Sequence, residues 1–384
     1  MTPTQSTLAE QIAERLLERN RIFEDFFARE APRLAVVSQE MAERFQRGGR
    51  LLAFGRGACA TDAQHVSVEF VHPVIVGKRA LPALDLSAAF TPWLDALARP
   101  EDIVMGFAPP EGDIEVEAGL ETARARRAMV LSFPAVNPDA FVHQEGIEIL
   151  YHTLWETVHV FLEHREMGKD TGPAGFLYPF LGQNKHDAAS LLKEVAESIR
   201  MKAADDARLR AQVAEEQSEQ IAATALAIDE RLRRGGKLIL FGNGGSATDA
   251  NDWALDCVAP PNGWRPIPAI SLSMEPANIS AIANDVGTEV VFLRQLIAHA
   301  QPADVAVGIS TSGGSRNIVI ALEEARKRGL LTVALLGYDG GEILRRGLAD
   351  FPLIVRCDYI PRIQEVQASI YHSLRAVQEG VAHA

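Results

Sequence analysis

The sequence predicts an α/β fold with two domains, each a parallel sheet flanked by helices. The chain has 384 residues, which is enough for two hydrophobic cores of ordinary size. The stretch "FGRGACATDA" at 54–63 recurs as "FGNGGSATDA" at 241–250, each time after an apolar run. A second pair follows in the same order, "HQEGIEILYHTL" at 143–154 and "IQEVQASIYHSL" at 363–374. Ordered repetition at two places indicates a duplicated domain.

Each copy begins with long amphipathic helices. In the first, "RFQRGGRLLAFGRG" then predicts a helix end, a glycine stop, a buried strand and a glycine turn, and "RLRRGGKLILFGNG" repeats this order in the second. Further on, "ADVAVGIS", "LLTVALLG" and "FPLIVRC" are short apolar runs separated by helical segments such as "RNIVIALEEARKRG". Strands that alternate with helices in this way predict a parallel sheet covered on both faces.

The stretch "MGKDTGPAGFLYPFLGQNKHD" separates the two copies and is rich in glycine and proline. We therefore predict a first domain over 1–166, a linker over 167–185 and a second domain over 186–384. The first copy is the shorter between its two matched segments, which trimming after duplication explains.

The composition narrows the classes of function. The net charge is −13, and basic residues are mixed with acidic ones in helical segments, which argues against a nucleic-acid groove. The N-terminus lacks the basic head and apolar run of a signal peptide, and no apolar stretch is long enough to span a membrane. We expect a cytoplasmic protein without nucleic-acid or membrane partners. Three cysteines without CxxC spacing predict free thiols.

Two glycine- and serine-rich turns predict a phosphate site in the second copy. The stretch "GISTSGGSRN" at 308–317 ends a strand and opens a helix, where free backbone N–H groups and the helix dipole favour an anion. The turn "NGGS", Asn243 to Ser246, ends a neighbouring strand at the sheet edge where such folds bind ligands. Either turn alone could be no more than a cap.

Together, "FGNGGSATDA", "GISTSGGS" and "RIQEVQASIYHSL" make residues 186–384 resemble the phosphoheptose isomerases, which belong to the sugar isomerase (SIS) domain superfamily. The resemblance implies two tandem SIS domains, each of the flavodoxin-like three-layer αβα type. It also implies that one set of residues contacts the sugar phosphate: Asn243, Gly244, Gly245, Ser246, Asn284, Asp285, Ser310, Thr311, Ser312, Ser315 and Gln364.

The same family carries a divalent-metal site of the zinc type. Its ligands are a His and a Glu four residues apart on the helix after the glycine turn, with a Gln and a His eight apart on the last helix. Both spacings keep the side chains on one helix face. In the first copy these positions hold His65, Glu69, Gln144 and His152. The quartet is altered in the second copy, which has Asp252, Asp256, Gln364 and His372.

The first copy has in turn lost the phosphate loop. Aligning "EDIVMGFAPPEGD" on "ADVAVGISTSGGS" puts three other residues at the serine positions: Ala108, Pro110 and Asp113. Proline has no N–H to donate, and a carboxylate about 4 Å from a phosphate costs on the order of 4 kcal/mol per unit charge near a surface. Arg56 replaces Asn243 and could give one charge-assisted contact or be a solvated turn residue. We predict that the first copy alone does not hold a sugar phosphate.

The resemblance implies an aldose–ketose isomerisation between sedoheptulose 7-phosphate and D-glycero-D-manno-heptose 7-phosphate through an enediol. A carboxylate removes a proton beside the carbonyl, and an acid returns it on the neighbouring carbon. We expect Glu69 to act with His152, or Asp256 with His372 if the second copy works alone. The sequence also allows a composite pocket to which both copies contribute, within one chain or across two.

Two other functions stay open. A sugar-phosphate-binding regulator without catalysis would keep the serine loop and tolerate the two aspartates, and the four metal-type residues of the first copy would then be core residues inherited by descent. Alternatively, the trimmed first copy could reshape the pocket for a different phosphosugar. Wide apolar stripes on the last helix of each copy predict a homodimer that forms a pseudo-tetramer of SIS domains.

Overall fold

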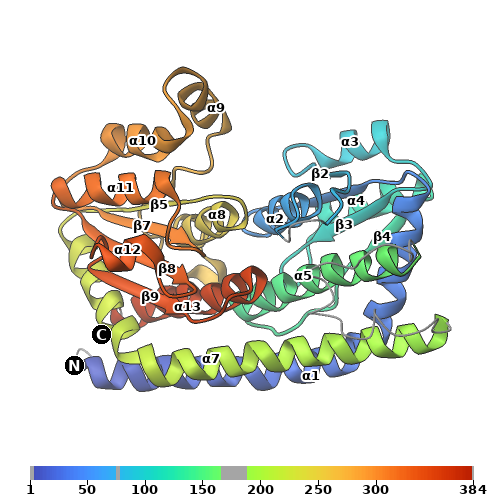
Figure 1. Ribbon diagram of the computed structural model, residues 1–384, viewed down its shortest axis with the longest axis horizontal. Helices are drawn as coiled ribbons and strands as arrows, with labels where there is room; N and C mark the ends of the chain where they lie inside the picture. The colour runs from blue at the N-terminus through green and yellow to red at the C-terminus, as the bar shows by residue number, and fades with distance from the viewer. Residues whose placement is uncertain (1–3, 75–77, 166–187, 383–384) are drawn as a thin grey trace. The chain divides into compact units, whose positions relative to one another are not determined.

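The computed structural model describes residues 4–74, 78–165 and 188–382, and within them it shows two parallel sheets flanked by helices (Figure 1). The α/β fold class predicted from the sequence is therefore confirmed. The linker predicted over 167–185 lies outside the described residues. Among the described residues, none of the helices contains an apolar stretch of the length that a membrane span needs.

The chain divides into two compact units. The N-terminal unit is Asn20–Asp205, and the C-terminal unit combines Met1–Arg19 with Asp206–Ala384. The beginning of the chain thus packs with the second copy of the repeat. The division at 166 and 186 describes the repeat in the sequence and stays a prediction.

The N-terminal unit contains a four-stranded sheet with the order β2-β1-β3-β4, in which all neighbours are parallel. Its strands are β1 (Leu51–Gly55), β2 (Ala83–Asp85), β3 (Ile103–Phe107) and β4 (Met129–Leu131). Its helices are most of α1 (Gln5–Gln46), then α2 (Cys59–Val71), α3 (Phe90–Leu97), α4 (Ile114–Ala125), α5 (Ala140–Arg165) and the first part of α7 (Ala188–Arg233).

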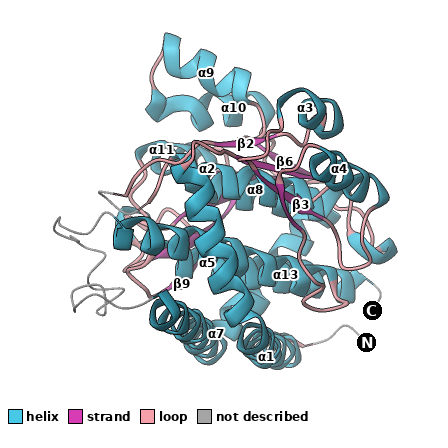
Figure 2. Ribbon diagram, turned by 90° about the vertical axis from the view of Figure 1, so that its right-hand side faces the viewer, coloured by secondary structure: helices cyan, strands magenta, loops and turns pink. Residues whose placement is uncertain are grey.

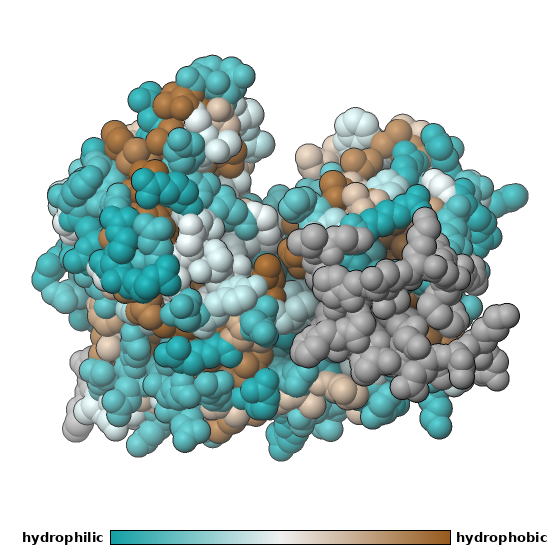
Figure 3. Space-filling model, in the orientation of Figure 1, coloured by the Kyte–Doolittle hydropathy of each residue, from teal (hydrophilic) through white to brown (hydrophobic). Residues whose placement is uncertain are grey.

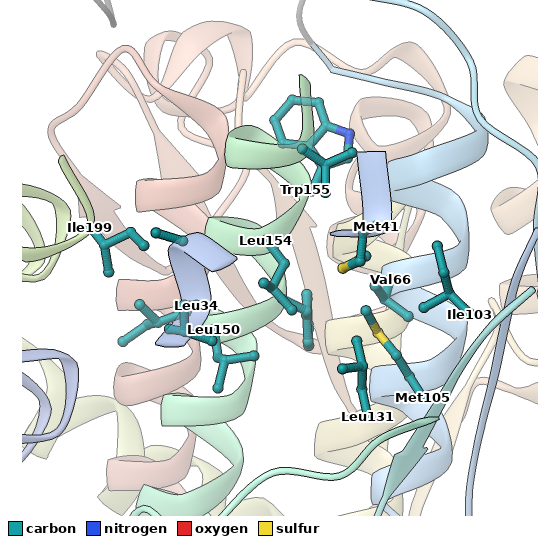
Figure 4. Packing of buried hydrophobic residues seen from close by; sticks show 14 of the residues in the cluster. Leu34, Met41, Val66, Ile103, Met105, Leu131, Leu150, Leu154, Trp155 and Ile199 are labelled. Carbon is teal, nitrogen blue, oxygen red and sulfur yellow. The ribbon is translucent and has the colours of Figure 1, made fainter. Parts of the chain in front are cut away.

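Both faces of this sheet are covered by apolar clusters. Successive side chains of a strand point to opposite faces, so Leu51 and Ala53 join the cluster with α2 and α5, while Leu52 and Phe54 join the cluster with α3 and α4. Figure 4 shows the first cluster, in which Met105 packs near side chains of α2 and α5. Burial on both faces explains why the strands are continuous apolar runs in the sequence.

The C-terminal unit contains a five-stranded parallel sheet with the order β6-β5-β7-β8-β9. Its strands are β5 (Leu238–Gly242), β6 (Ala269–Ser271), β7 (Val305–Ser310), β8 (Leu331–Gly337) and β9 (Phe351–Val355). Besides parts of α1 and α7, its α-helices are α8 (Gly245–Val258), α9 (Pro276–Asp285), α10 (Val291–His299), α11 (Arg316–Lys327), α12 (Gly341–Arg345) and α13 (Ile360–Ala382). Two 3₁₀ turns span Pro261–Gly263 and Thr288–Val290.

The first turns of α1 complete one core of the C-terminal unit. Leu8, Ile12 and Leu16 are buried in the same cluster as Val213 and Ile221 of α7 and the residues of β5 and β7 that face them. Here α1 and α7 lie side by side, and Figure 2 shows both helices nearly end-on. Residues from the beginning of the chain therefore stabilise the sheet of the second copy.

Within each sheet, the two strands that end at the glycine turns pair in the same register. Phe54 lies opposite Gly106 in one sheet, and Phe241 lies opposite Gly308 in the other. This correspondence supports the alignment of the two copies through Gly106 and Gly308. Among the described residues, the sheet of the N-terminal unit ends at β4, which is consistent with trimming of the first copy.

Candidate functional site

Two polar turns meet at the carboxyl edge of the C-terminal sheet. Strands β5 and β7 are neighbours, with Gly242 opposite Ile309, so the turns that follow them begin side by side. The side chains of Asn243 and Asn317 exchange hydrogen bonds of 3.0 and 2.9 Å, which join the first turn to the start of α11. The structure thus brings together the two turns that the sequence predicted as one phosphate site.

The second of these turns leaves hydrogen-bond donors at the N-terminus of α11. Ser315 is the N-cap residue, but its side chain makes no capping hydrogen bond, and its Oγ lies 3.2 Å from Ser310 Oγ instead. Ser312 Oγ accepts a hydrogen bond of 3.2 Å from the Gly314 N–H. Gly244 begins α8 likewise without a side-chain cap. Helix N-termini without caps are suited to anions because their first N–H groups have no partner inside the helix.

A third turn, after β8, supports the serine loop. Gly313 and Gly341 have positive φ angles of 60° and 55°, and a Cβ on Gly341 would lie 2.3 Å from the Ser312 carbonyl oxygen. The Ile343 N–H donates a hydrogen bond of 2.9 Å to the Gly313 carbonyl. Only glycine permits so close an approach of the two backbones, so the loop is held in shape before any ligand binds.

Three other predicted sugar-phosphate residues come from α9 and α13. Asn284 and Asp285 end α9, where both are exposed and Asn284 Nδ2 donates to Asp285 Oδ1 at 2.7 Å. No hydrogen bond among the described residues joins them to the loop. Gln364 is buried near the start of α13.

Helix α9 contributes no buried residue to the C-terminal unit. In Figure 1 it stands above α10 and α11. Figure 3 shows hydrophobic atoms on this part of the surface. Met274 and Val286, which flank α9 in the sequence, are exposed hydrophobic residues.

Asp252 and Asp256 of α8 meet His372 of α13. His372 Nε2 lies 3.1 Å from Asp256 Oδ2 and 3.5 Å from Asp252 Oδ2. All three side chains are buried. Burial and the charge of Asp252 raise the pKa of Asp256 to about 7, although His372 and Arg375 act in the opposite direction. This carboxyl group can therefore exchange a proton near neutral pH.

Two buried residues beside this triad were missed in the sequence. Tyr371 donates its hydroxyl to Asp252 Oδ2 at 2.7 Å. Arg375 donates Nε to the Asp256 carbonyl at 3.2 Å and Nη2 to the Arg265 carbonyl at 2.6 Å, which fixes the end of α8. The place of Arg375 three residues after His372 was an available signal, because residues three or four apart share a helix face. Tyr371 is adjacent to His372, and helix spacing gives no such signal for it.

His65 and Glu69 of α2 meet His152 of α5 in the N-terminal unit. His65 Nε2 lies 3.3 Å from His152 Nε2 and 3.9 Å from Glu69 Oε1, and all three side chains are buried. Burial and the neighbouring His152 lower the pKa of His65 well below its usual value, so its imidazole is neutral at pH 7. Neutral imidazole is the form that binds metals.

Gln144 of α5 contacts the beginning of α2. It precedes His152 by eight residues, which is about 12 Å along a helix. Its Nε2 lies 3.4 Å from both the Ala58 carbonyl and Thr61 Oγ1 in the first turn of α2. The structure therefore brings three residues of the predicted quartet together, and the part of Gln144 in a metal site stays a prediction.

Both triads have ligand atoms suited to a divalent cation. In each triad one nitrogen or oxygen per residue lies within 4.8 Å of the other two, and all the residues are buried. Two imidazoles and one carboxylate, as in the N-terminal unit, form a common ligand set of catalytic zinc. The residues present thus fit the metal that the family resemblance implies.

In the N-terminal unit an aspartate stands in place of the last serine of the phosphate loop. Asp113 caps α4, because its Oδ1 accepts hydrogen bonds of 2.8 and 3.0 Å from the N–H groups of Glu115 and Val116. Arg56 Nη1 lies 3.2 Å from Asp113 Oδ2 and 3.1 Å from Glu115 Oε1. Arg56 is thus engaged with protein carboxylates, and the helix N-terminus already holds a negative charge. This arrangement supports the prediction that the first copy does not bind phosphate alone.

The chain is similar to SIS-domain proteins and to phosphoheptose isomerases. A model of the SIS domain matches residues 203–337. A phosphoheptose isomerase from Geobacter sp. (strain M21) is 47% identical over 151 residues, which are 39% of this chain and 77% of that protein. A phosphoheptose isomerase from Thermodesulfovibrio yellowstonii is 36% identical over 189 residues, which are 49% of this chain and 93% of that protein.

A solved structure extends the likeness in fold to the whole chain. The superposition on the tagatose-6-phosphate ketose/aldose isomerase from Escherichia coli includes 100% of this chain and 96% of that protein, with a TM-score of 0.53 and 14% identity. At that identity the likeness shows the fold alone. The two curated relatives are matched over most of their own length, and this chain therefore belongs to the phosphoheptose isomerase family of SIS-domain proteins.

Proposed function

We propose that the protein is a sugar-phosphate isomerase that interconverts sedoheptulose 7-phosphate and D-glycero-D-manno-heptose 7-phosphate. One observation carries the proposal: the C-terminal unit combines a preformed serine loop with buried acid–base groups. The loop follows β7, while Asp256 and His372 lie 3.1 Å apart between α8 and α13. Membership in the phosphoheptose isomerase family supports the choice of substrate.

The serine loop binds the phosphate of the sugar. The N–H groups at the start of α11 and the hydroxyls of Ser310, Ser312 and Ser315 donate to the phosphate oxygens. We assign Asn243 and the glycines after it to the same anion, because the two turns share one sheet edge.

Proton transfer requires a base and an acid near the first two carbons of the sugar. Asp256 and His372 share the unit with the serine loop, and a carboxyl group with a pKa of about 7 can both take and return a proton. Glu69 and His152 keep the residue types of the family, and they are the alternative pair. In either pair the imidazole lies beside the carboxylate and can relay the proton.

The triad of the N-terminal unit would hold zinc. His65, Glu69 and His152 supply two nitrogens and one oxygen, and the neutral state of His65 suits this role. A bound divalent cation polarises carbonyl and hydroxyl oxygens of a sugar. Burial of the three side chains keeps them fixed and excludes bulk water from them.

The test is turnover of sedoheptulose 7-phosphate by the full-length chain, with and without a chelator. We expect Ser312→Ala to raise KM about tenfold, because a charge-assisted hydrogen bond contributes about 1.5 kcal/mol. Asp113→Asn at the altered loop is the matched control and should leave KM unchanged. Absence of turnover by the wild-type protein would contradict the proposal.

Two variants identify the base. Asp256→Asn or Glu69→Gln should lower kcat by about 100-fold or more, because general acid–base catalysis contributes at least that factor. A loss confined to Asp256→Asn would place proton transfer in the C-terminal unit, and a loss confined to Glu69→Gln would assign it to the family's original residue.

A sugar-phosphate-binding regulator is the second candidate. It is favoured by the aspartates that stand where the family has a His and a Glu, and by the hydrogen bond that Tyr371 already donates to Asp252. Calorimetry that detects binding of the sugar phosphate to a protein without turnover would support this alternative.

A further inference from the structure

The two buried triads occupy corresponding places in the two units but differ in ligand chemistry. Helices α2 and α8 both follow the glycine turn, and the matching strand registers align them. His65 thus corresponds to Asp252, Glu69 to Asp256, and His152 to His372. The N-terminal triad has two imidazoles and one carboxylate, whereas the C-terminal triad has one imidazole and two carboxylates.

Ligand type governs which divalent cation such a site selects. Imidazole suits zinc, while carboxylate oxygens suit harder cations such as Mn²⁺ and Mg²⁺. We propose that the chain carries two metal sites of unlike preference: the N-terminal triad for zinc, and the triad Asp252, Asp256 and His372 for a hard divalent cation such as Mn²⁺.

The charges of the C-terminal triad favour a cation. Asp252 and Asp256 are 4% and 2% exposed, so two carboxylates lie around a single imidazole with little access to water. Arg375 directs Nε to the main-chain carbonyl of Asp256, and its Nη1 pairs with Glu379 Oε2 at 3.2 Å. A divalent cation among the three ligand atoms would displace the proton of Asp256 and neutralise both carboxylates.

Tyr371 acts as a positioning residue for this site. Its hydroxyl donates to Asp252 Oδ2 at 2.7 Å and so fixes the orientation of a ligand carboxylate. Hydrogen bonds of this kind to ligating groups typically change metal affinity by about 10- to 100-fold. The corresponding Tyr151 packs its ring beside the His65 imidazole, with the ring centroids 5.2 Å apart.

The experiment measures metal content rather than activity. Metal-depleted full-length protein is loaded with one equivalent of Zn²⁺ and titrated with Mn²⁺, while the electron paramagnetic resonance signal of free Mn²⁺ is followed. We expect one further equivalent of Mn²⁺ to bind per chain. Asp256→Asn should weaken Mn²⁺ binding at least tenfold and keep the bound zinc, and His65→Asn should lose zinc and keep Mn²⁺.

Reciprocal and matched variants sharpen the result. Asp252→His gives the C-terminal triad the ligand types of the N-terminal one and should shift its preference from Mn²⁺ toward Zn²⁺. Tyr371→Phe should weaken Mn²⁺ binding by about tenfold, while the same change at Tyr151 should not. This pair keeps the inference testable if Asp256→Asn does not fold, which circular dichroism would reveal.

Two results would overturn the inference: zinc-loaded wild-type protein that binds no Mn²⁺, or Mn²⁺ binding that Asp256→Asn and Tyr371→Phe leave unchanged. The inference rests on the proposed function only for the zinc site of the N-terminal unit. Because metal content and turnover are separate measurements, either can fail while the other holds.

Discussion

At the scale of single residues, Asp256 links the site to the stability of the protein. Burial and Asp252 raise its pKa from 3.8 to about 7, so the folded chain keeps this proton in a pH range where the unfolded chain has lost it. The stabilisation from the protonated group is therefore complete below pH 3.8 and is lost as the pH rises through about 7.

We predict a pH-dependent difference between wild type and Asp256→Asn in the presence of a chelator. From about pH 5 to pH 8, the unfolding temperature of the wild type should fall more than that of the variant, because the amide does not ionise. Differential scanning calorimetry measures both. The acid-side effect of the depressed pKa of His65 is common to the two proteins and cancels in the difference. Parallel curves would contradict the prediction.

The sequence could identify residues whose contacts are close in the chain, but not those whose partners are far away in the sequence. The spacing of His65 and Glu69, like that of Asp252 and Asp256, is local to one helix, so it could be predicted and the structure brings each pair to a histidine. The contact between Arg375 and the Arg265 carbonyl joins segments 110 residues apart, and no local pattern signals it. Gln144 contacts Ala58 and Thr61 at the beginning of α2, and its role as a metal ligand stays a prediction.

At the scale of elements, the serine loop depends on the glycine turn after β8. Alanine substitutions at two glycines separate the effect of backbone strain from the effect of the contact between this turn and the serine loop. Gly341 and Gly347 both have positive φ, 55° and 59°, but a Cβ would meet the Ser312 carbonyl only at Gly341, whereas nothing lies within 4 Å at Gly347.

We predict that Gly341→Ala weakens binding of the sugar phosphate about tenfold or more and that Gly347→Ala does not. Both variants should lose roughly 1 kcal/mol of stability from the positive φ. Only Gly341→Ala must also displace the serine loop. Titration calorimetry with the sugar phosphate and urea unfolding of each variant provide the measurements. Equal binding by the two variants would show that the loop does not depend on this contact.

The elements themselves followed from the sequence more readily than their ends. The buried strands could be predicted because both faces of each sheet are covered, which produces continuous apolar runs. The replacement of the phosphate loop by a capping Asp113 was also predictable from the aligned residues. The ion pairs of Arg56 were not, since they depend on side-chain positions on α4.

At the scale of the whole molecule, helix α1 contributes to both compact units. Its amphipathic pattern predicts a helix, but a pattern does not say which core the apolar face joins. The glycine-rich stretch suggested a cut between sequential halves, whereas the first turns of α1 pack with the C-terminal unit. The homodimer and pseudo-tetramer stay predictions from the apolar stripes of the last helices.

We predict that Leu16→Ala destabilises the C-terminal unit by about 2–5 kcal/mol, because it removes a fully buried side chain from that core. The neighbouring Leu17 is 49% exposed, so Leu17→Ala is the control and should change stability by about 0.5 kcal/mol or less. Hydrogen exchange of peptides from α8 and α13 measures the local effect. If Leu16→Ala speeds exchange no more than Leu17→Ala, the first turns of α1 do not support this unit.

The origin of that core in two distant parts of the chain has a consequence during synthesis. Leu8, Ile12 and Leu16 leave the ribosome well before any residue beyond 206 has been made, and their packing partners lie there. Since domains generally fold as their residues emerge, the N-terminal unit can fold while these three apolar side chains still lack a partner. The nascent chain therefore exposes a short apolar segment for much of translation, and we expect a chaperone to bind there.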